Sequence, residues 1–127
     1  MQEILKDYLS QIQNITEKDK EHTYRTFLHT LLIKIQEKTA YTNIKIIHEP
    51  NNDKEGRGAP DFLITKDSLI LGYIENKRIN EDLSKILQTQ QIKKYLDLSL
   101  NLILTDYLRF CLIGLDNKNN PIILKEL

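Results

Sequence analysis

Two carboxylates and one amine in the middle of the chain have the types and spacing of a site that hydrolyses phosphodiesters. Asp61 follows Pro60, and Glu75 and Lys77 lie further along with one residue between them. Carboxylate oxygens are hard ligands that suit Mg²⁺, which keeps several waters and also takes phosphate oxygens. Such an ion activates a water and neutralises charge on the scissile phosphate. A lysine beside that water can orient it and stabilise the developing oxyanion.

The elements that position these residues are predicted to form a β-hairpin. Two segments rich in branched and aromatic residues flank a turn-prone stretch: residues 61–65, residues 69–77 and, between them, residues 66–68. Side chains two apart on a strand share a face, so Glu75 and Lys77 should point the same way. Folding the hairpin back brings Asp61 opposite this end of the strand, within a residue or two of Glu75. The run 69–74 is nearly all apolar, as in a central strand, which favours this interpretation over a solvated strand face.

Hydrophobic periodicity predicts the remaining elements. Apolar residues at helical spacing predict helices, and isoleucine-rich and leucine-rich runs predict strands. The helices are expected at 2–13, at 16–38 with Thr16 as N-cap, and at 81–98 with Asn80 as N-cap; the further strands are expected at 43–49, 100–105, 109–115 and 121–124. The predicted order is α-α-β-β-β-α-β-β, with a possible last strand. We therefore expect a single α/β domain over residues 1–127, a central mixed sheet flanked by helices, whose third helix connects two parallel strands.

Composition excludes several classes of protein. The formal net charge is +0, whereas a stand-alone DNA-binding module usually carries a basic footprint. The single cysteine, Cys111, excludes an internal disulfide and fits a reducing cytoplasm. No apolar run approaches the roughly 20 residues that span a bilayer, so no membrane is expected. The three histidines, His22, His29 and His48, lack the spacing of a zinc site.

The chain resembles the PD-(D/E)XK nuclease superfamily in the motif Pro60-Asp61 followed by Glu75-Asn76-Lys77, which that superfamily carries on such a hairpin. The resemblance implies a restriction-endonuclease-like core that cleaves DNA with Mg²⁺, for which Mn²⁺ can substitute. It implies that Asp61, Glu75 and the backbone carbonyl of Asn76 hold the metal.

Two further features match this superfamily. Glu21, on the helix before the hairpin, stands where a glutamate often completes the metal site. A Gln-x-x-x-Tyr motif on the following helix is present as Gln91 and Tyr95, and Gln91 is predicted to take part in catalysis. Simpler interpretations exist for each: Glu21 as a helix-start acid, and Gln91 and Tyr95 as ordinary surface and core residues. His22 beside Glu21 is a further candidate for contact with the site or a phosphate.

A finer resemblance is to the nuclease domain at the N-terminus of restriction–methylation fusion enzymes. Its segments are 21–25, 58–62, 72–77 and 101–107. In those enzymes a methyltransferase and a target-recognition region follow the nuclease. This resemblance implies that the chain is one domain of a longer polypeptide, which would explain its neutral charge, and that a dimer is possible for double-strand cleavage.

Double-stranded DNA is the partner that the resemblance implies. The candidate contact residues are Arg57, Arg78, Lys93, Lys94 and Tyr95, with Lys54 and Lys85 as further basic residues. Scattered lysines are otherwise a common feature of any solvated surface. Two other functions stay open. One is a Holliday-junction resolvase, against which the neutral charge counts. The other is an inactive nuclease fold that serves as an interaction module, against which an intact Asp, Glu and Lys set counts.

Overall fold

The computed structural model describes residues 1–15, 20–39, 43–48 and 60–127, and for residues 20–22 it describes the backbone alone. Four helices and six strands lie within these ranges. The helices are α1 (Gln2–Gln13), α2 (Lys20–Thr39), α3 (Leu83–Ile86) and α4 (Gln90–Leu98). The strands are β1 (Ile44–His48), β2 (Phe62–Lys66), β3 (Leu69–Asn76), β4 (Leu102–Thr105), β5 (Phe110–Leu115) and β6 (Pro121–Glu126).

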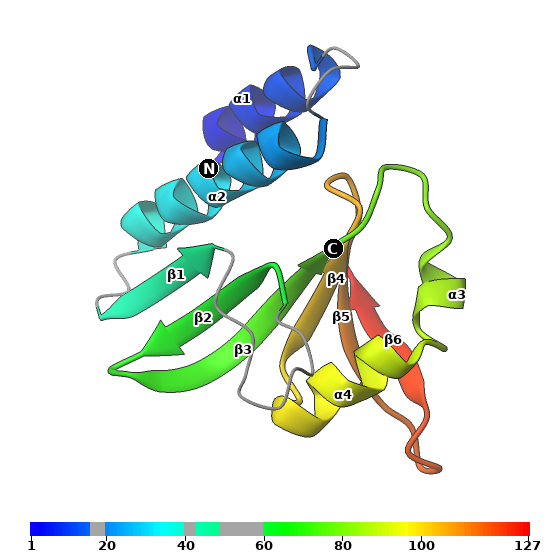
Figure 1. Cartoon of the computed structure of the whole chain (residues 1–127). Helices are drawn as coiled ribbons and strands as arrows, with labels where there is room; N and C mark the ends of the chain where they lie inside the picture. Colours follow the sequence, from blue (N-terminus) through cyan, green and yellow to red (C-terminus); the bar gives the residue numbers. More distant parts are fainter. Residues whose placement is uncertain (16–19, 40–42, 49–59) are drawn as a thin grey trace.

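The described strands form one mixed sheet in the order β1-β2-β3-β4-β5-β6. Neighbouring strands are antiparallel except β3 and β4, which are parallel. A parallel pair needs a crossover connection, and α3 and α4 provide it (Figure 1). The predicted fold class, a mixed sheet flanked by helices with a helical crossover, is confirmed.

Each face of the sheet packs on its own pair of helices, because neighbouring side chains of a strand point to opposite faces. Tyr73 belongs to the core with α3 and α4, where Leu83, Ile92 and Tyr95 are fully buried. Ile74, the next residue, belongs to the core with α1 and α2. By the same alternation, Glu75 and Lys77 are on the α4 side and Asn76 is on the α2 side.

The prediction of one continuous third helix over residues 81–98 is wrong, because the structure has two shorter helices there, α3 and α4. The Thr89 hydroxyl donates to the Ile86 carbonyl at 2.8 Å, and the extended backbone of Thr89 begins a new helix. The cap is Asp82, whose carboxylate accepts the Ser84 N–H, whereas Asn80 has a positive φ of 66°. The predicted N-cap of the second helix, Thr16, lies outside the described residues. The last strand ends at Glu126, two residues beyond its predicted end.

Gly72 lies where β3 approaches the backbone before β4. A Cβ at this position would lie 2.5 Å from the Asn101 carbonyl oxygen, which is backbone and cannot rotate away. At Gly114 the added Cβ would instead meet the side chain of Leu124, which is 56% exposed and free to turn outward. We therefore expect Gly72→Ala to lower the free energy of unfolding by about 1–3 kcal/mol, and Gly114→Ala to lower it far less. Urea unfolding of both variants tests this, and equal losses would contradict it.

No helix in the described ranges combines the length and the apolar character that crossing a membrane requires.

Candidate active site

Asp61 and Glu75 lie next to each other at the ends of β2 and β3. Phe62 pairs with Ile74 in the antiparallel ladder, which places Asp61 opposite Glu75. The Asp61 N–H donates to Glu75 Oε1 at 3.3 Å, and the Asn76 N–H donates to Asp61 Oδ2 at 2.7 Å. Each acid is thus tied to the strand that carries the other. The hairpin therefore brings together Asp61 and Glu75, the two carboxylates that the sequence predicted to lie close to each other.

The Glu75 carboxylate is in an environment that disfavours its charge. It is buried, with 4% of its surface exposed. Burial, followed by the hydrogen bond and negative charge of Asp61, raises the pKa of Glu75 to about 8, although Lys77 acts to lower it. A cation placed between the two carboxylates would oppose this shift, because it stabilises the charged form of both acids.

Lys77 lies at the same end of the sheet. Its backbone N–H donates to the Thr105 carbonyl of β4 at 2.7 Å. Its Nζ lies 3.7 Å from Glu75 Oε2 and donates to Gln91 Oε1 at 3.4 Å. The Gln91 amide in turn donates to the Tyr95 hydroxyl at 3.0 Å. The amine is therefore held between a carboxylate of the sheet and an amide near the start of α4.

Gln91 and Tyr95 have the exposures of a surface residue and a core residue, as the simpler interpretation of each expects. Gln91 is exposed and lies in the first turn of α4. Tyr95 is fully buried, and burial, followed by the charges of Glu75 and Asp61, raises its pKa. The prediction that Tyr95 contacts DNA is wrong, since a side chain with 0% exposure offers no contact surface. Its hydroxyl accepts a hydrogen bond from the Gln91 amide and so fixes the position of that side chain.

Arg25 is a site residue to which the sequence reasoning gave no role. Its Nη2 lies 2.8 Å from Asp61 Oδ1, and its side chain is 21% exposed. The sequence spacing could have indicated Arg25, because it comes four residues after Glu21 on α2 and hence lies on the same side of that helix. Glu21 itself lies in the first turn of α2, but its side chain is outside what the structure describes.

Tyr107, in the turn between β4 and β5, was missed as well. Its φ is 76°, and this turn is secured by the Thr105 hydroxyl, which accepts the Tyr107 N–H at 2.9 Å. The Tyr107 ring stacks on Tyr24 of α2 with centroids 5.0 Å apart. Burial raises the pKa of Tyr107 to about 12, while Arg25 acts to lower it. Tyr107 therefore lies beside the guanidinium that contacts Asp61. Its sequence signal was its place in the segment 101–107 that carries the finer resemblance, which gave it no role.

The other candidate residues are the basic residues expected to contact DNA and the three histidines, and the structure describes the side chains of only some of them. Arg78, Lys85, Lys93 and Lys94 are exposed, and their contact with DNA stays a prediction. Arg57 and Lys54 lie outside the described residues, as does the side chain of His22. His29 and His48 contact each other and Phe62 on the α2 side, with ring centroids 5.6 Å apart between the two histidines. These rings belong to core packing.

The described donors suit Mg²⁺ rather than a metal held by a full protein cage. Within the described part of the chain, no three His, Cys, Asp or Glu side chains gather around one point. Two carboxylates are nevertheless what Mg²⁺ commonly takes from a protein, with waters and phosphate oxygens filling its other positions. The Asn76 carbonyl faces the same side as its N–H, which donates to Asp61. Asp61, Glu75 and this carbonyl therefore fit the predicted ion.

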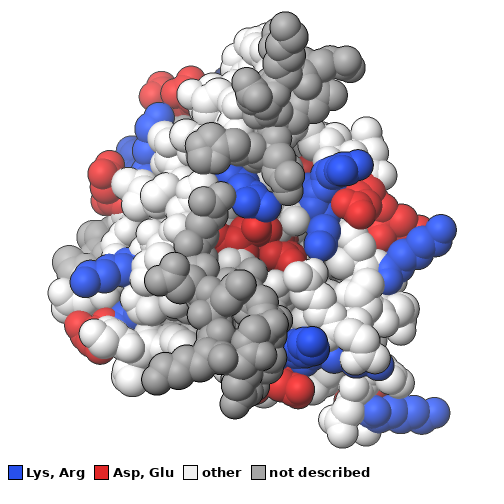
Figure 2. Space-filling view, in the orientation of Figure 1, with Lys and Arg blue, Asp and Glu red and all other residues white. Residues whose placement is uncertain are grey.

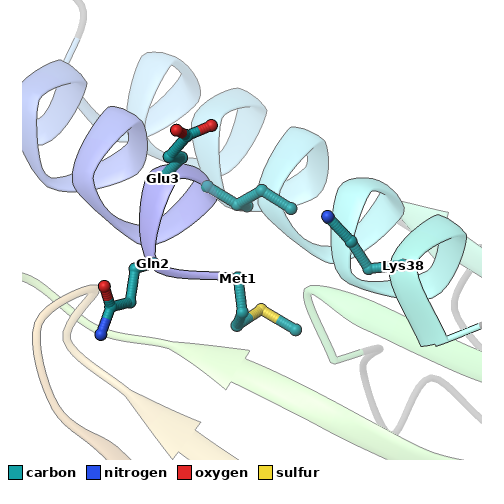
Figure 3. A pocket seen from close by; sticks show the side chains of 5 residues that line it. Met1, Gln2, Glu3 and Lys38 are labelled. Carbon is teal, nitrogen blue, oxygen red and sulfur yellow. The ribbon is translucent and has the colours of Figure 1, made fainter.

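The surface around the site is mixed in charge. In the face shown in Figure 2, acidic atoms of the described residues lie near the middle and are bordered by basic atoms. A separate hollow at the start of α1 is lined by Met1, Gln2, Glu3, Ile4 and Lys38 (Figure 3). It includes none of the predicted catalytic residues.

The comparisons with known proteins bear on the fold. No protein-family model matches the chain, and no curated protein matches it. Among solved structures, a chain of the cryoEM structure of a DrdV–DNA complex matches with a TM-score of 0.72 and 17% identity. The match covers 100% of this chain and 86% of that one. The two chains share a fold.

Proposed function

We propose that the chain is a Mg²⁺-dependent endonuclease that hydrolyses DNA phosphodiester bonds. The observation that carries this proposal is the convergence of Asp61, Glu75 and Lys77 at the shared end of β2 and β3. The DrdV chain of the same fold comes from a complex with DNA, which supports DNA as the substrate. The neutral charge supports a cleavage domain to which other domains deliver the DNA. The resemblance in sequence implies that these are the recognition and methyltransferase domains of a restriction–modification enzyme.

Each residue has a distinct role in this proposal. Asp61, Glu75 and the Asn76 carbonyl would hold Mg²⁺, which supplies charge to polarise the phosphate and to activate water when bound. Lys77 extends its amine beside Glu75, where it can donate a hydrogen bond to the attacking water and to the phosphate oxygen that gains charge. Gln91 holds that amine in place through its own hydrogen bond to Tyr95. Arg78, Lys93 and Lys94 are exposed and available to phosphates flanking the cut.

A plasmid assay tests the proposal. Supercoiled DNA is incubated with the purified chain and Mg²⁺, with Mn²⁺, or with EDTA. Nicked or linear product is expected with either metal and none with EDTA. An Asp61→Asn preparation made in the same way should leave the plasmid intact, whereas Asp67→Asn, at the exposed hairpin turn, should cleave as the wild type does.

The substrate of the same assay separates the competing functions. Preference for a four-way junction over linear duplex would favour a resolvase. Cleavage that persists in Asp61→Asn would mean that the site is wrongly placed. Failure to bind Mn²⁺ any better than Asp61→Asn does would favour an inactive nuclease fold.

A further inference from the structure

Arg25 holds one side of Asp61 while the sheet holds the other. The guanidinium Nη2 is 2.8 Å from Asp61 Oδ1, and the Asn76 N–H donates to Asp61 Oδ2 at 2.7 Å. Asp61 itself is 13% exposed and Arg25 is 21% exposed. Both oxygens of the carboxylate thus already have a donor. A metal ion that approaches Asp61 from the Oδ1 side meets a resident positive charge.

Each described acid of the site has a positively charged neighbour without a metal. Arg25 lies 2.8 Å from Asp61, and Lys77 lies 3.7 Å from Glu75. A buried carboxylate pair with no cation would be strongly unfavourable, and a partly buried arginine is a suitable partner for it. Addition of a divalent ion would leave this set with an excess of positive charge. Such an excess favours the binding of an anion in the same place.

We propose that Arg25 is the counter-ion of the metal-free site, that it competes with the divalent cation for Asp61, and that it moves to a DNA phosphate when metal and substrate bind. This inference rests on the proposed function and assigns Arg25 a positioning role in the metal-free enzyme and a phosphate-binding role in the complex. The flat fork of a guanidinium matches phosphate oxygens as well as carboxylate oxygens. Its partial exposure gives it access to such a ligand.

Competition through Arg25 couples the two ligands. Without DNA, a bound cation lies near the positive guanidinium, and this repulsion weakens metal binding. With DNA, the phosphate attracts the guanidinium away from Asp61, so the metal binds more tightly. By linkage, the metal tightens DNA binding by the same factor. The enzyme would therefore assemble its complete site only on DNA.

Titration of the DNA-free chain with Mn²⁺ tests the competition. Arg25→Gln should bind Mn²⁺ at least ten-fold more tightly than the wild type, because the repulsion is gone while the Asn76 N–H still orients Asp61. Arg25→Lys retains a positive charge and should stay near the wild-type affinity. The matched control is Arg109→Gln, which breaks an arginine–carboxylate pair of the same 2.8 Å length with Glu126 away from the site. Its Mn²⁺ affinity should be unchanged.

A second titration tests the coupling. A DNA duplex should tighten Ca²⁺ binding by the wild type and do so much less for Arg25→Gln. Circular dichroism spectra and melting curves in EDTA establish that each variant is folded; should Arg25→Gln fail to fold, Arg25→Met and Arg25→Lys provide the same comparison of a neutral and a charged side chain.

The outcomes distinguish the two proposals. Unchanged or weaker Mn²⁺ binding by Arg25→Gln would overturn the competition and make Arg25 a simple support for Asp61. Equal tightening in Arg25→Lys and Arg25→Gln would also overturn it, because charge would then not be the cause. If Asp61→Asn binds Mn²⁺ as the wild type does, the proposed metal site itself fails, whatever the Arg25 variants do.

Discussion

Replacing Lys77 with methionine is expected to lower the single-turnover rate of DNA cleavage by a hundred- to a thousand-fold while Mn²⁺ binding is retained. The Lys77 amine is 3.7 Å from Glu75 Oε2 and is held by Gln91. Removal of a single donor to a developing oxyanion commonly costs about 3–4 kcal/mol of transition-state stabilisation. Methionine keeps a long unbranched stem, and the Lys77 backbone stays bonded to Thr105 of β4, so the strand itself should not move.

The expected result separates the rate of cleavage, which should fall, from the affinity for Mn²⁺, which should not. Loss of the positive amine leaves both carboxylates in place, so the Mn²⁺ affinity should not fall. Lys66→Met, at the exposed end of β2, is the control and should cleave at the wild-type rate. A Lys77→Met enzyme that keeps more than a third of the wild-type rate would remove Lys77 from the mechanism. A rate loss that is explained entirely by weaker Mn²⁺ binding would instead make it a structural partner of Glu75.

Glu75→Gln is expected to stabilise the metal-free chain at alkaline pH. The pKa of Glu75 is raised from 4.5 to about 8 by burial and by Asp61. In the unfolded chain this carboxyl ionises near its ordinary pKa, whereas in the folded chain it keeps its proton up to about pH 8. The folded state thus binds more protons between these values, so the wild type loses stability as the pH rises from about 4.5 to 8. Glutamine cannot ionise and removes this loss.

Urea unfolding in EDTA at several pH values measures the effect. The advantage of Glu75→Gln over the wild type should grow by about 2–5 kcal/mol between pH 5 and pH 9. Glu37→Gln, on the exposed side of α2, should show no comparable change with pH. Addition of Mn²⁺ at pH 9 should stabilise the wild type and leave Glu75→Gln almost unaffected. A constant difference between the two proteins across this range would show that Glu75 ionises normally in the fold.

The sequence by itself determined the hairpin and the position of its acids. Apolar residues on both sides of Lys66-Asp67-Ser68 predict a β-hairpin. The two-residue period of a strand then places Glu75 and Lys77 on one face. The turn pairs Lys66 with Leu69, a register that would place Asp61 opposite Ile74, and an irregularity between Ile64 and Thr65 moves Asp61 opposite Glu75. The approach of the two acids to within a residue or two is a local consequence of the hairpin and could be predicted. The exact pairing depends on the irregularity, which the sequence pattern does not reveal.

Only the tertiary structure decided which distant groups surround that hairpin. Arg25 reaches Asp61 because α2 packs across the sheet. Gln91 reaches Lys77 because the break at Thr89 gives α4 its own direction. Tyr107 lies beside Arg25 in a turn with a positive φ, where its N–H donates to the Thr105 hydroxyl. Each of these contacts depends on how separate elements pack, and long-range packing leaves no periodic signal in the sequence. The carboxylate pair was therefore predictable, and the counter-charge that accompanies it was not.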